Sequence, residues 1–134
     1  MSYQIIWKSK GIHISFKGSF TPADHTQTSN VLYSDPRIDH IQYIIRDLSG
    51  ISEASVEMDD LTLPAAIDRG ASHYLNTLKV ALVATNEQTR NVCQMYIELS
   101  KRFHTHWHFQ LFSSVGEAQR WASVPQCPSG ITAL

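Results

Sequence analysis

Three histidines at alternate positions are the side chains best suited to chemistry in this sequence. His104, His106 and His108 lie in the run FHTHWHF, residues 103–109. In a β-strand, alternate side chains share a face about 6.5 to 7 Å apart, so three imidazoles can approach one zinc, copper or nickel ion. The other interpretation is the polar outer face of a strand. We favour that one, because no Cys, Asp or Glu adjoins the triplet as a further ligand.

The other candidates for chemistry are weaker. Cys93 follows Val92 in a helical stretch and is interpreted as a small buried apolar residue, not as a nucleophile. The carboxylates of Glu57, Asp59 and Asp60 are interpreted as solvated loop residues. None of the patterns GxGxxG, GxxxxGKS/T, HExxH or GxSxG occurs. We therefore expect no enzymatic activity, no cofactor and no resident metal.

Composition and charge favour a single soluble domain. The chain has 134 residues, of which 43% are hydrophobic and 17% charged, with a net charge of −1. That balance is typical of one compact domain and argues against binding to nucleic-acid backbones. Two cysteines, Cys93 and Cys127, form neither a disulfide framework nor a metal pair. With no long apolar run, these features predict a cytoplasmic protein without membrane insertion.

The period of the apolar residues predicts alternating strands and helices. Residues 3–7 and 12–16 alternate as a β-hairpin, and Thr21 and Pro22 cap and start a helix. Few apolar residues anchor that helix, namely Ala23, Val31 and Leu32. The elements expected afterwards are a strand at 41–48, a loop at 49–63, a helix at 64–76, a strand at 78–84, a helix capped by Thr85 and extending to 103, a strand at 104–112 and a short helix after Ser114.

This order predicts the fold class. Strands separated by helices form parallel crossovers, whereas the first strand pairs antiparallel with the second. We expect an α/β domain over residues 1–123, with one five-stranded mixed sheet and about four helices, followed by a flexible tail at 124–134. In the last strand, alternation directs the core residues inward and the three histidines outward. The expected core residues of that strand are Thr105, Trp107, Phe109 and Leu111.

The segment RDLSGISEAS, residues 46–55, is the strongest candidate for a binding site. It follows an apolar strand, at the carboxyl end where α/β sheets place ligand or partner sites. A plain surface loop of small residues is the alternative. We retain both interpretations, because short polar loops need no function to exist.

Two motifs carry a resemblance to a known family. These are DLSGIS, residues 47–52, after an apolar strand, and the ending FSSVGEAQRW, residues 112–121. With the element order, they make residues 3–123 resemble the SpoIIAA-like proteins, bacterial domains similar in fold to the STAS anti-sigma-factor antagonists and to lipid-binding CRAL-TRIO domains. The resemblance implies a small cytoplasmic α/β module, often dimeric, without established enzymatic activity.

The phosphorylation motif of the true antagonists is not retained. In those proteins the strand is followed by DLSGV and then by DSSG, whose serine is phosphorylated by a partner kinase. This chain keeps Asp47 to Ile51, but Ser55, Val56 and Glu57 stand where DSS would fall. The phosphorylation switch is therefore not transferred to this chain.

Two functions of different classes follow. The first is a non-catalytic module that binds a protein partner, or a second copy of the chain, through residues 47–60 and the adjacent helix. The second is a binder of a small apolar or lipid-like ligand, in which the helix from Pro64 to Leu75 lifts from the sheet and a pocket is lined by Met58, Leu61, Leu63 and Tyr74. The candidate binding residues are Asp47, Ser49, Ser52, Ser55, Met58, Leu61 and Tyr74.

Overall fold

The structure is a computed structural model that describes residues 2–54, 56–75, 77–103 and 105–124. Its strands are β1 (Ser2–Trp7), β2 (Gly11–Ser19), β3 (Tyr43–Glu53), β4 (Lys79–Val83) and β5 (His108–Phe112). Its α-helices are α1 (Pro22–Tyr33), α2 (Thr62–Ser72), α3 (Glu87–Arg102) and α4 (Val115–Ser123). Two 3₁₀ helices, η1 (Pro36–His40) and η2 (Met58–Leu61), precede β3 and α2.

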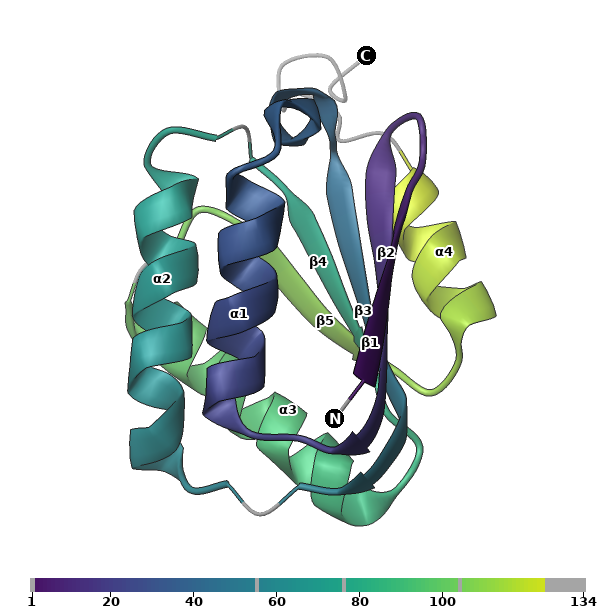
Figure 1. The fold of residues 1–134 in the computed structure, drawn as a ribbon, viewed down its shortest axis with the longest axis vertical. Helices are drawn as coiled ribbons and strands as arrows, with labels where there is room; N and C mark the ends of the chain where they lie inside the picture. Colours follow the sequence, from purple (N-terminus) through teal and green to yellow (C-terminus); the bar gives the residue numbers. More distant parts are fainter. Residues whose placement is uncertain (1, 55, 76, 104, 125–134) are drawn as a thin grey trace, which may run out of the picture.

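The five strands form one mixed sheet in sequence order, β1-β2-β3-β4-β5. β1 runs antiparallel to β2, with Ile5 opposite Ile14, and every later neighbouring pair is parallel. Helices α1, α2 and α3 cover one face of the sheet, and α4 alone covers the other (Figure 1). The expected fold class is therefore confirmed.

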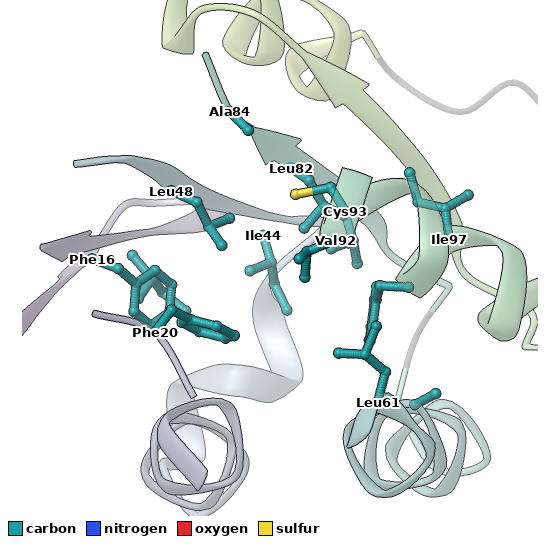
Figure 2. Close-up of a cluster of buried hydrophobic side chains, with 14 of the residues drawn as sticks. Phe16, Phe20, Ile44, Leu48, Leu61, Leu82, Ala84, Val92, Cys93 and Ile97 are labelled. Atoms are coloured by element: carbon teal, nitrogen blue, oxygen red, sulfur yellow. The ribbon is translucent and has the colours of Figure 1, made fainter. Parts of the chain in front are cut away.

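Each face of the sheet has its own apolar core. On the three-helix face, Ile44, Leu48 and Leu82 extend from the sheet toward Leu61 and Val92 (Figure 2). On the opposite face, a smaller cluster packs against Ala118 and Ala122 of α4. The sheet residues of that smaller cluster are Tyr43, Ile45, Ala81 and Val83. β3 and β4 contribute to both clusters, which explains why their sequences are apolar on both faces.

Capping residues set the starts of three helices. The Thr21 backbone N–H donates to Asp24 Oδ2 at 2.8 Å at the start of α1. Ser114 Oγ accepts from the Glu117 N–H at 3.2 Å at the start of α4, as its sequence predicts. The cap of α3 is Asn86, whose Oδ1 accepts from the Thr89 N–H at 2.8 Å. The expectation that Thr85 caps this helix is wrong by one residue, because the Asn side chain reaches the N3 amide.

The boundaries around β3 and α2 differ from those expected. β3 spans Tyr43–Glu53, so residues 49–53 are strand and not loop. α2 spans Thr62–Ser72, starting before Pro64 and ending before the expected limit at Asn76, which lies outside the described residues. The longer β3 arises from pairing between residues that are distant in sequence. β2 pairs with β3 as far as Ser19 and Glu53.

β5 begins at His108 and not at residue 104. Its first residue pairs with Lys79, the first residue of β4, so the neighbouring strand limits its length. The inward orientation of Trp107 is confirmed, because its side chain is buried. Phe109 and Leu111 also pack against the main core.

α1 buries a polar face. Of its three expected apolar anchors only Leu32 is buried, whereas Ala23 and Val31 are exposed. The other residues that α1 buries are His25, Thr28 and Ser29. A helix with so few apolar contacts is held in place by polar partners on other elements.

Candidate functional site

The segment that follows Arg46 is a strand with an irregular edge. Ser15 of β2 lies opposite Asp47, but Lys17 lies opposite Gly50, so β3 carries an extra residue in this stretch. A Cβ on Gly50 would lie 2.6 Å from the Phe16 carbonyl oxygen, which explains the glycine. β4 ends at Val83, opposite Asp47. The rest of β3 therefore pairs with β2 alone.

The two described serines of this segment, Ser49 and Ser52, are exposed. Asp47 Oδ1 accepts hydrogen bonds from the Ser49 N–H at 3.0 Å and from Ser49 Oγ at 2.6 Å. Ser55 lies outside the described residues. The exposed edge is held by Asn86, whose Nδ2 donates to the Ile51 carbonyl at 3.3 Å.

Exposed carboxylates follow the end of β3 and flank an exposed leucine. We call this surface the acidic segment; it consists of Glu53, Glu57, Asp59 and Asp60, and all four side chains are exposed. Leu63, in the first turn of α2, is 61% exposed beside it. An exposed apolar side chain with charged neighbours is typical of a surface that contacts another macromolecule.

The remaining candidate residues do not gather around one pocket. Leu61 is buried and lines a small cavity, and Met58 is half-buried against the core. Tyr74 is 67% exposed beyond the C-terminal end of α2, while Met58 and Leu61 precede that helix. The expected lining by Met58, Leu61, Leu63 and Tyr74 is therefore not present in this arrangement of α2.

The cavity beside Leu61 has a volume of about 40 Å³. Its wall combines apolar side chains, among them Phe16, Leu48 and Val92, with the polar groups of His25, Arg46 and Tyr96. Sites for drug-sized ligands measure about 300 to 1,000 Å³. This cavity has room for a few water molecules and not for a lipid chain.

A buried cluster of polar side chains adjoins the cavity and joins four elements. Asp68 of α2 lies at its centre and accepts from Arg46 Nη1 of β3 at 3.1 Å and from Tyr33 OH of α1 at 2.5 Å. Tyr96 OH of α3 also donates to Asp68. His25 Nε2 of α1 lies 3.4 Å from the same carboxylate. We call these five residues the Asp68 cluster.

The charges of the Asp68 cluster compensate one another. Burial alone would raise the pKa of the Asp68 carboxyl, but the Arg46 guanidinium and the hydrogen bond from Tyr33 hold it below its usual range. Burial lowers the pKa of His25, and the nearby Asp68 carboxylate offsets only part of that effect. At neutral pH the cluster therefore holds one ion pair, Arg46 with Asp68, and a neutral imidazole. It connects α1, α2 and α3 to the sheet.

Sequence reasoning missed the Asp68 cluster, although two signals point to it. Arg46 interrupts the apolar strand IQYIIRDL, and Asp68 falls on the same side of α2 as Ala65 and Ala71. A charged residue on a buried face needs a partner. The identity of that partner was not visible, because Asp68 lies 22 residues from Arg46 and 28 from Tyr96.

The two described histidines of the triplet, His106 and His108, do not share the face of one strand. His106 precedes β5 and its ring packs against His73, with the ring centroids 6.5 Å apart. His108 is the first residue of β5 and is exposed, and His104 lies outside the described residues. Within the described ranges, no group of three or more His, Cys, Asp or Glu side chains is placed to hold a metal ion.

Cys93 lies on the buried side of α3, as its sequence context predicts. Burial raises the pKa of its thiol to about 12. The side chain is therefore a protonated thiol at neutral pH and not a nucleophile. Cys127 lies outside the described residues.

Comparisons with known proteins identify the fold. No protein-family model matches the chain, and no curated protein matches it. Among solved structures, the anti-sigma factor antagonist SpoIIAA in its unphosphorylated form is similar, with a TM-score of 0.60 and 12% identity, over 93% of this chain and 100% of SpoIIAA. The chain has the SpoIIAA fold.

Two further structures share this SpoIIAA fold. An anti-sigma factor antagonist from Mycobacterium paratuberculosis has a TM-score of 0.58 and 16% identity, over 92% of this chain and 94% of that protein. An uncharacterised protein of the DUF3478 family with a SpoIIAA-like fold, from Shewanella loihica PV-4, has a TM-score of 0.51 and 19% identity. The match covers 90% of this chain and 92% of that protein. The resemblance that the sequence motifs indicate is confirmed at the level of the fold.

The helices were compared with the length and apolar character of a membrane span. Within residues 2–124, apart from the three undescribed positions, no helix combines the length and the apolar character needed to cross a bilayer.

Proposed function

We propose that this chain is a non-catalytic regulatory module that binds a protein partner through residues 47–60 and the first turn of α2. The fold supports this proposal, because two of the similar structures are anti-sigma factor antagonists. The partner is a protein of the same cell. Without the DSSG sequence, we propose that binding does not depend on phosphorylation of a serine after this strand.

The observation that carries the proposal is the contrast between the small cavity and the exposed surface. A cavity of about 40 Å³ gives a lipid-like ligand no room unless α2 moves. The acidic segment and the exposed Leu63 are instead accessible without any movement. A partner that fits this surface presents basic side chains around an apolar contact.

The test is affinity capture from an extract of the source cells with two charge variants. Glu57→Lys with Asp59→Lys reverses charge inside the acidic segment. The triple variant Gln27→Lys, Asn30→Lys and Glu98→Lys adds the same positive charge at exposed helical positions elsewhere. The proposal predicts that the wild type and the triple variant capture the same protein in fixed ratio, and that the double variant loses it.

Two other results of this capture experiment would contradict the proposal. Equal capture by all three proteins would place the contact on another surface. Capture of no protein, with a small apolar molecule retained by the wild type, would replace the proposal by the ligand-binding alternative. Melting temperatures of the three proteins, measured in parallel, separate loss of binding from loss of folding.

A further inference from the structure

A groove of about 640 Å³ lies along the outer edge of the sheet, far in sequence from the acidic segment. β5 is the last strand in the sheet order, and its residues His108 to Gln110 form part of the wall. Lys79 and Trp121 line one part of the groove and Lys101 of α3 another. The surface is therefore an open strand edge between two covered faces.

The backbone of β5 has unused hydrogen-bonding groups on this edge. The His108 N–H donates to the Leu78 carbonyl and the Phe112 carbonyl accepts from the Ala84 N–H. In a parallel pair, alternate residues direct their N–H and C=O groups toward the same neighbour. Phe109 and Leu111 therefore direct theirs away from β4, where no strand of the described chain pairs with them.

Two hydroxyl groups in the groove wall also lack partners. Ser100, whose side chain is 2% exposed, and Thr105 both line the groove. Neither hydroxyl oxygen has a hydrogen-bond partner among the described residues. A buried hydroxyl without a partner is uncommon and costs stability, and both oxygens are shielded from solvent, so a ligand in the groove reaches them only if the wall moves.

The charge of the groove selects the chemistry of the ligand. Its described lining includes Lys79, Lys101 and His108, and it includes no carboxylate. The Lys79 ammonium already donates to the Trp121 carbonyl at 3.0 Å and to the Val124 carbonyl at 2.6 Å, which leaves Lys101 as the cation that can meet a ligand. Lys101 is exposed and forms no ion pair within the described ranges. Trp107, Phe109 and Trp121 supply aromatic surface between these polar groups.

We propose that the edge of β5 binds an extended, acidic peptide segment of a partner protein by strand addition. The peptide pairs its backbone with Phe109 and Leu111 and places a carboxylate near Lys101. Main-chain hydrogen bonds supply affinity in this mode, and alternate side chains supply specificity. The site is separate from the acidic segment, so it does not depend on the function proposed above.

The experiment selects short peptides from a random display library on the full chain and then measures amide hydrogen exchange with the selected peptides bound. The proposal predicts that acidic residues and β-branched residues are enriched. It also predicts that exchange slows at Phe109 and Leu111. Gln110 is the internal control, because its N–H faces β4 and is already protected.

Charge variants give the second measurement. Lys101→Glu replaces attraction by repulsion and should weaken binding of the selected peptides by roughly threefold to tenfold. Lys17→Glu makes the same change at an exposed position of β2 and should leave binding unchanged. The Glu57→Lys, Asp59→Lys variant should also bind these peptides normally, which distinguishes this site from the first.

Several results would overturn the proposal. These are an absence of binders, enrichment of peptides without excess carboxylates, or unchanged exchange at Phe109 and Leu111. Slow exchange at both amides in the free protein, independent of concentration, would show that the chain covers its own edge. Slow exchange that appears only at high concentration would assign the edge to a second copy of the chain.

Discussion

The two faces of the sheet are stabilised in different ways. The three-helix face contains the Asp68 cluster, an ion pair with two tyrosines and a histidine, beside a large apolar core. The face under α4 has an apolar centre, with Ala118 and Ala122 in close contact with the sheet, and no ion pair among the described residues. Beside that centre, Gln119 of α4 forms hydrogen bonds with His13 and Tyr43 of the sheet. One face depends on compensation of charge and the other on close packing. Their responses to mutation should therefore differ in kind.

The largest expected effect is on the charged face. Asp68→Ala leaves the Arg46 guanidinium buried without its counter-ion and removes the acceptor used by Tyr33 and Tyr96. Loss of one partner of a buried pair costs about 3 to 5 kcal/mol of unfolding free energy. Urea denaturation measures this loss of unfolding free energy. Asp59→Ala, at an exposed position, is the control and should change stability by less than about 0.5 kcal/mol.

The apolar face should respond to volume. Ala118 is fully buried between α4 and the sheet, so Ala118→Leu forces α4 away from Ile45 and Ala81. Such overpacking costs about 1 to 3 kcal/mol. Arg120→Leu adds an apolar side chain to the exposed side of α4 and should be nearly neutral. If Ala118→Leu were also neutral in urea denaturation, close packing would not be what holds α4.

Acid should weaken the charged face selectively. The pKa of His25 is lowered in the folded protein, so below about pH 6.5 the unfolded chain binds a proton that the folded chain does not. Stability contributed by the neutral ring is present above that pH and is lost as the pH falls, by at most about 1.4 kcal/mol per pH unit. Between pH 7 and pH 5, the unfolding free energy of the wild type should fall more steeply than that of His25→Gln. Parallel slopes would show that His25 is not the group responsible.

The smallest effect concerns the cavity beside the Asp68 cluster. Val92 lines the cavity, so Val92→Ile adds a methyl group to empty space and should stabilise the fold by about 0.5 to 1 kcal/mol. Val80 is fully buried but does not line the cavity, and Val80→Ile should destabilise by about 1 kcal/mol through overpacking. Thermal denaturation of the two variants should give shifts of opposite sign.

Elements with local signals were predictable from the sequence. Thr21 with Asp24 and Ser114 with Glu117 mark helix starts by spacing alone, and the alternation in the first hairpin predicts its pairing. The second half of β3 was not predictable, because Ser49 and Gly50 favour a loop locally. That strand forms through pairing with β2 over a distance in sequence that periodicity does not report.

The candidate surface was predictable only in part. The position of residues 47–52 after an apolar strand correctly indicated the carboxyl end of that strand, and Ser49 and Ser52 are exposed there. Tyr74 belongs to the other end of α2, because that helix ends at Ser72. The Asp68 cluster was missed because its five members are spread over four different elements, and only the tertiary structure brings them together.

Native mass spectrometry of the untagged chain, purified gently from its own cells, tests the central claim most directly. The central claim is that the exposed side chains among residues 47–60 bind a protein, while the buried charges maintain the fold. It predicts a wild-type complex with a second protein chain that is absent for Glu57→Lys with Asp59→Lys. A stoichiometric apolar small molecule bound to both proteins, with no second chain, would contradict it.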